Sequence, residues 1–170
     1  SLEDWQQASA AMPKNFDLLT SYPRAIQERL GLKLAEVALR DGDTKTADIL
    51  LDALNKDRKF LKPWTLAGLD YLKGEIHRQA GESALAAELW EPLSKGKDDL
   101  YRTKASLALT MLELQNKTIT EEKAIDRLEG LRYHWRGDEM EAQVNFILGK
   151  LYLGQERYLK GFTLLRDAAA

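Results

Sequence analysis

Cysteine is absent from this chain of 170 residues. Without thiols the chain has no disulfide bond, no thiolate metal ligand and no cysteine nucleophile. Proline is also scarce, with 4 residues, and glycine contributes 11. A sequence with so little of either residue is not expected to contain a long disordered tract. The length is enough for one domain with a substantial hydrophobic core.

An excess of charge of one sign is lacking as well. The 25 Lys and Arg residues nearly balance the 27 Asp and Glu residues, and the net charge is −2. Recognition of nucleic acid calls for a basic face, so we predict no nucleic-acid partner. No apolar run approaches the roughly 18 residues of a membrane-spanning helix, which predicts a soluble segment without membrane insertion. Composition is compatible with either the cytoplasm or the periplasm.

Helical periodicity is the main pattern that is present, and no segment shows sustained strand alternation. Between 24 and 40, one face carries Ile26, Leu30, Leu34, Val37 and Ala38. We predict an all-α fold. Its further helices are expected at 44–56, at 63–79, from 83 until Pro92 ends or kinks the helix, at 98–114, near 120–135, from 138, and after the turn at 155–156.

The predicted boundaries follow from turn and capping residues. Gly42 suits the left-handed position after a helix, and Asp43 or Thr44 suits the next N-cap. Pro63 fits a first helical turn, where its missing N–H costs nothing. Residues 1–23 are less regular, and we interpret them as an N-terminal helical cap or the end of a preceding repeat.

Small residues recur at one place in successive helix pairs. In the first helices they are Ala35, Gly74, Ala108 and Gly149, and in the second helices Ala47, Ala86, Ala124 and Gly161. Two helices pack closely only where one of them presents a residue without bulk. One hairpin cannot bury its own apolar face, so neighbouring hairpins are expected to stack.

This pattern resembles the tetratricopeptide repeat. The best copy consists of Leu148, Gly149, Tyr152, Gly161, Leu165 and Ala168. The resemblance covers residues 24–170, in four copies at 24–56, 63–95, 98–135 and 138–170. It implies a right-handed α-solenoid of about four antiparallel hairpins. The stretch 128–138 also looks like a turn found in large bacterial proteins built from such repeats.

In the resembled family, the first helices line a concave groove that binds a peptide or a helix of another protein. Carried over to this chain, the groove residues are Leu39, Tyr71, Glu75, Arg78, Arg102, Leu109, Phe146, Lys150 and Leu153. They mix apolar side chains with both signs of charge, as a peptide-binding surface does. The resemblance therefore implies a scaffold segment of a larger protein whose partner is another protein.

Residues for chemistry are few. The only two histidines, His77 and His134, lack the spacing of a metal site, and neither a phosphate loop nor a nucleophile elbow is present. We predict no catalytic, metal or cofactor site. Two alternatives stay open: a structural segment that self-associates as a homo-oligomer, and the helical domain of a larger glycan-acting enzyme, for which Glu36 or Glu75 is the only candidate.

Overall fold

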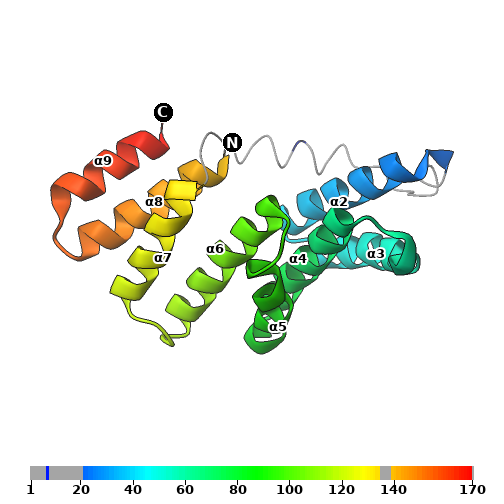
Figure 1. Cartoon of the computed structure of the whole chain (residues 1–170), viewed down its shortest axis with the longest axis horizontal. Helices are drawn as coiled ribbons and strands as arrows, with labels where there is room; N and C mark the ends of the chain where they lie inside the picture. The colour runs from blue at the N-terminus through cyan, green and yellow to red at the C-terminus, as the bar shows by residue number, and fades with distance from the viewer. Residues whose placement is uncertain (1–6, 8–20, 135–138, 170) are drawn as a thin grey trace. The chain divides into compact units, whose positions relative to one another are not determined.

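The computed structural model describes residue 7, residues 21–134 and residues 139–169. Those residues form α-helices and one short 3-10 helix, without any strand, which confirms the predicted all-α class. In chain order the elements are α2 (Arg24–Arg40), α3 (Thr44–Asn55), the 3-10 helix η2 (Arg58–Phe60), α4 (Pro63–Gln79), α5 (Ser83–Ser94), α6 (Asp99–Gln115), α7 (Glu121–His134), α8 (Glu139–Gly154) and α9 (Tyr158–Ala168) (Figure 1). None of these described helices is both long and apolar enough to cross a bilayer.

Most helix boundaries fall within one residue of their predicted positions. The exception is α5, which does not end at Pro92 but continues to Ser94. Because only two helical residues follow Pro92, its missing N–H and its ring affect the last turn alone. The predicted cap or preceding repeat at 1–23 and the predicted N-cap at Asp138 lie largely outside the described residues.

The same turn joins the two helices of each of the four pairs α2–α3, α4–α5, α6–α7 and α8–α9. Its central residue has a left-handed backbone, with φ of 80° at Gly42, 80° at Gly81, 57° at Lys117 and 60° at Glu156. The N–H of the next residue then donates to the carbonyl oxygen five residues earlier. These bonds run from Asp43 to Ala38, from Glu82 to His77, from Thr118 to Glu113 and from Arg157 to Tyr152, at 2.8–2.9 Å. This Schellman arrangement satisfies carbonyls that the helix end leaves unpaired.

The chain divides into two compact units, residues 1–101 and residues 102–170. In the first unit, α2 packs on α3 and α4, and α4 packs on α5. Its core is formed by buried residues of α2, α3, η2–α4 and α4: Leu32, Ala35, Ala38, Leu39, Ala47, Leu50, Leu51, Leu61, Leu69 and Leu72. The fully buried Trp90 of α5 lies against Gly74 of α4, where a Cβ atom would be 2.2 Å from Nε1 of the indole.

In the second unit, α8 packs against both α7 and α9. The core is Leu107, Ile125, Leu128, Met140, Val144, Leu148, Tyr152 and Leu164. Gly149 of α8 and Gly161 of α9 meet where the two helices cross, because a Cβ atom on either would lie 3.0–3.1 Å from the carbonyl oxygen of the other. The predicted close approach at this pair is confirmed. Ala108 differs from the other small residues, since it is only partly buried.

Candidate functional site

Tyr71 is the centre of the predicted binding residues in the first unit. It lies on α4, and its ring stacks on Trp90 with centroids 6.1 Å apart and an angle of 29° between the rings. Its ring centroid is 5.9 Å from that of Tyr101. The indole Nε1 of Trp90 donates to the backbone oxygen of Tyr71 at 3.0 Å. The Tyr71 ring is therefore held by neighbours on α5 and α6.

Charged side chains surround this aromatic trio. Glu36 of α2 pairs with Lys33 at 2.9 Å and with Arg40 at 3.5 Å. Glu75 of α4 pairs with Arg78 at 2.9 Å. Both carboxylates are thus engaged in ion pairs with basic residues of their own helix.

The same environment changes the acidity of the two phenols. Burial raises the pKa of Tyr71 strongly, and the negative charges of Glu75 and Glu36 raise it further. Burial, with Glu36 and Asp98 contributing, raises the pKa of Tyr101 to about 12. Both phenols therefore stay protonated at neutral pH, and each keeps an O–H group that can donate a hydrogen bond.

The predicted binding residue Leu39 does not lie on an accessible surface. Its side chain is 5% exposed and belongs to the core of the first unit. Its backbone oxygen accepts a hydrogen bond from Nε2 of Gln79 at 3.0 Å, which links α2 to α4. Leu39 therefore supports the first unit, and only Tyr71, Glu75 and Arg78 of the predicted set are brought together there.

In the second unit, the predicted residues separate into packed and exposed ones. Leu153 packs over Gly161, where a Cβ atom would be 2.7 Å from its Cδ2. Arg102 and Leu109 of α6 are partly buried. Phe146 of α8, in contrast, is 51% exposed, and Nζ of Lys150 lies 5.6 Å from its ring centroid. The exposed part of the predicted surface is therefore this aromatic–cation pair, one helical turn apart.

Sequence reasoning missed a polar cluster that joins α7, α8 and α9. The hydroxyl of the buried Tyr152 donates to Glu129 at 2.7 Å, and Lys160 contacts the same hydroxyl at 2.7 Å and Glu129 at 2.8 Å. Burial alone would raise the pKa of Glu129, but the hydrogen bonds from Lys160 and Tyr152 lower it overall. These partners come from three different helices, so no spacing in the sequence could indicate them. Tyr152 is only 2% exposed, whereas the side chains of Glu129 and Lys160 are partly exposed, so the cluster satisfies a buried hydroxyl from the surface.

Nothing in the described residues resembles a metal centre, and no group of three potential ligands is present there. His77 lies on α4 with its Nδ1 2.6 Å from a carboxylate oxygen of Glu82. The side chain of His134 lies outside what the structure describes.

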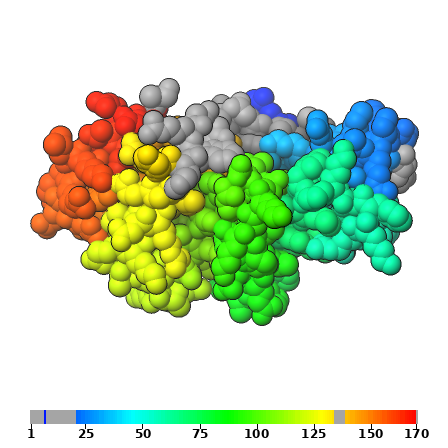
Figure 2. All heavy atoms as spheres, in the orientation of Figure 1, coloured from blue at the N-terminus to red at the C-terminus, as the bar shows by residue number. Residues whose placement is uncertain are grey.

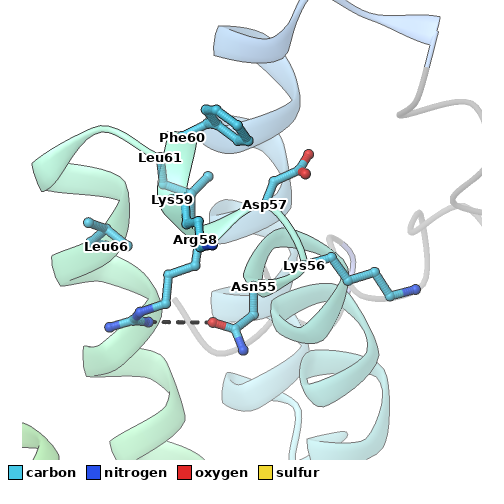
Figure 3. A pocket seen from close by; sticks show the side chains of 8 residues that line it. All are labelled: Asn55, Lys56, Asp57, Arg58, Lys59, Phe60, Leu61 and Leu66. Carbon is cyan, nitrogen blue, oxygen red and sulfur yellow. Dashed lines mark hydrogen bonds between the residues drawn. The ribbon is translucent and has the colours of Figure 1, made fainter.

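The link between α3 and α4 forms a hollow of about 710 Å³. It is lined by Asn55, Lys56, Asp57, Arg58, Lys59, Phe60, Leu61 and Leu66 (Figure 3). Arg58 makes two bonds to Asp70 of α4, at 2.9 and 2.8 Å. No sequence motif pointed to this surface, although four of the eight residues from Asn55 to Lys62 are basic.

Comparisons with known proteins do not add a relative. No protein-family model matches the chain, and neither the curated proteins nor the solved structures contain a match.

Proposed function

We propose that this chain is a non-catalytic protein-interaction segment built as a right-handed solenoid of helical hairpins like those of tetratricopeptide repeats. The recurrence of one turn at Gly42, Gly81, Lys117 and Glu156 supports the repeat architecture. The small residues where α4 meets α5 and α8 meets α9 support it as well. A solenoid of this kind presents the first helix of each hairpin as a continuous binding surface.

The observation that carries the interaction proposal is the pair Phe146 and Lys150. Both side chains extend from α8, whose other face packs Val144 and Leu148 in the core. The helix is thereby fixed, while the aromatic ring stays half exposed. An aromatic side chain on a rigid element, with a cation beside it, is typical of the residues that contribute most to protein interfaces. The partner is an extended or helical segment of another protein with an apolar anchor.

Site-specific photo-crosslinking tests this proposal. Benzoylphenylalanine replaces Phe146 in one variant and Leu85, an exposed apolar residue of the second helix α5, in the control variant. A partner crosslinked at 146 but not at 85 is then purified and titrated against the unlabelled chain. Phe146→Ala is expected to weaken its binding by about tenfold or more. Unchanged affinity in Phe146→Ala would contradict an interface at this position.

Self-association is a second candidate, because α9 leaves three large apolar side chains at the surface. Tyr158, Leu159 and Phe162 are 56%, 86% and 62% exposed. The space-filling view shows surface atoms of α9, orange-red to red, on the side facing the viewer (Figure 2). Exposed apolar patches of this kind mark association sites. Sedimentation at several concentrations decides: a concentration-dependent dimer that Leu159→Glu removes supports self-association, and a strict monomer rejects it.

A further inference from the structure

The basic hollow between α3 and α4 is a second surface, separate from the one proposed above. Its frame is fixed from two sides. From α2, Arg24 donates to the backbone oxygen of Asp57 at 3.3 Å and lies 5.4 Å from the ring centroid of Phe60. From α4, Asp70 accepts the two bonds from Arg58. The connector is therefore preorganised, which lowers the entropic cost of binding a ligand there.

The charge balance of the hollow is positive once these pairs are formed. Asp57 lies 3.7 Å from Arg24, which also pairs with Glu28 at 3.2 Å, and Asp70 is matched by Arg58. Lys56 and Lys59 line the hollow, and Lys62 follows the lining residue Leu61 in the sequence. Within the described residues, none of these three lysines has an ion pair or a hydrogen bond from its ammonium group. The local surplus contrasts with the chain's net charge of −2. Such a patch attracts carboxylates and speeds their encounter.

An apolar contact accompanies these cations. Phe60 is the aromatic residue that lines the hollow, and it is 72% exposed. Figure 3 shows its ring near α2, with Leu66 of α4 on the other side of the hollow and the Lys56 side chain extended away from Arg58. An occupant of the hollow can thus contact the Phe60 ring on one side and Leu66 on the other.

We propose that this hollow binds an acidic peptide segment that carries an apolar side chain. The volume of about 710 Å³ is within the usual range for a ligand site and far exceeds one carboxylate. The apolar side chain of the segment contacts Phe60 in the hollow, and its carboxylates meet the exposed lysines Lys56, Lys59 and Lys62 of the connector between α3 and α4. The volume of the hollow and its single aromatic side chain favour a peptide segment over a bilayer surface, and a nucleic acid strand would require an extended basic track with more aromatic platforms.

The test uses fluorescence anisotropy with the full chain at low salt. The probe is a labelled peptide of glutamate with leucine at every fourth position, and the control peptide has glutamine in place of each glutamate. The glutamate peptide is expected to bind at least about tenfold more tightly than the glutamine peptide, and the preference should shrink as salt is added. Equal binding of the two peptides, or no binding, would overturn the proposal.

Matched variants locate the binding. Lys56→Gln, Lys59→Gln and Lys62→Gln together are expected to weaken the glutamate peptide by about tenfold. Lys95→Gln, Lys97→Gln and Lys123→Gln remove the same charge from positions elsewhere, and should leave the Kd within about twofold. Equal losses in the two triple variants would reduce the effect to net charge and reject the site.

Phe60→Ala separates the apolar contact from the charges. It is expected to weaken the peptide by about fivefold without changing the salt dependence. The four changed side chains lie at the surface, so each variant is expected to fold, and circular dichroism checks this. Sedimentation with phosphatidylserine vesicles is the competing arm: lysine-dependent vesicle binding without peptide binding would replace the proposed partner with a membrane. Peptide binding that survives Phe146→Ala keeps this inference distinct from the function proposed above.

Discussion

Gly74→Ala is the sharpest test of how the first unit is packed. The new Cβ atom would lie 2.2 Å from Nε1 of Trp90 and 2.7 Å from its Cε2. Real Cβ contacts are never so short, and the contacting atoms belong to a rigid ring that is fully buried. Trp90 must therefore shift, and the shift loosens its 3.0 Å hydrogen bond to the backbone oxygen of Tyr71.

The magnitude follows from three terms. Overpacking of a core site costs about 1–3 kcal/mol, and a weakened buried hydrogen bond adds about 1 kcal/mol. Alanine recovers about 1 kcal/mol over glycine inside a helix. The net expected loss in the free energy of unfolding is about 1–3 kcal/mol. Urea denaturation followed by circular dichroism measures it.

Gly130→Ala is the matched control for this prediction. Gly130 lies in α7, and no neighbouring side chain or helix comes within 4 Å of the place that a Cβ atom would take. The same substitution there should stabilise the chain by about 0.5–1 kcal/mol through helix propensity alone. Combining Gly74→Ala with Trp90→Leu removes the ring and should recover part of the loss caused by the alanine. If Gly74→Ala were as stable as Gly130→Ala, the described packing of Trp90 on α4 would be refuted.

Three further measurements test other parts of the structure. Lys117→Gly and Glu156→Gly should each raise the free energy of unfolding by about 1 kcal/mol, because glycine avoids the left-handed strain, while Gly42→Ala should lower it by a similar amount. Glu129→Gln should lower stability by less than about 1 kcal/mol at pH 7, since Lys160 is 43% exposed. Because the pKa of Glu129 is lowered, its contribution to the free energy of unfolding is present above its ordinary value of 4.5 and is lost as pH falls through the folded pKa. The loss of stability in Glu129→Gln should therefore be larger at pH 7 than at pH 3. Ala86→Trp should overpack the fully buried site between α4 and α5 by about 1–3 kcal/mol, and an unchanged melting temperature would contradict the alignment of small residues.

Periodicity and capping chemistry predicted the helices well because both act locally. Asp43 accepts from the N–H of Thr46 at 3.0 Å, and Asp98 accepts from that of Tyr101 at 2.9 Å, as their positions before helices indicate. Pro92 does not end α5 at once, because a proline two residues before a helix end disturbs only the last turn, and the sequence alone does not give that distance. The left-handed turn at Gly42 was predictable from its glycine, whereas Lys117 and Glu156 give no local sign of the same conformation.

The predicted binding residues show the limit of a resemblance. Helical spacing places Phe146 and Lys150 on one face, and the structure brings the cation to the ring. Spacing alone could not separate them from Leu39 and Leu153, which pack inward against neighbouring helices. Which face of a helix stays open depends on contacts between elements distant in sequence. The connector from Asn55 to Lys62 was missed for the same reason, since its frame depends on Arg24 and Asp70.

The four helix pairs differ in the residues that form their turns and their close contacts. The first two pairs have glycine in the turn, and the last pair has glycine on both sides of the helix crossing. The α6–α7 pair has no glycine at the left-handed position of its turn, which is Lys117, and the small residue Ala108 of α6 is only partly buried. Instead, Arg127 of α7 pairs with Glu113 of α6, an ion pair in which both side chains are partly exposed and therefore weakly stabilising. Leu107 of α6 shares one core with Ile125 and Leu128 of α7 and with residues of α8 and α9, so burial in this common core stabilises the α6–α7 hairpin more than its surface ion pair does.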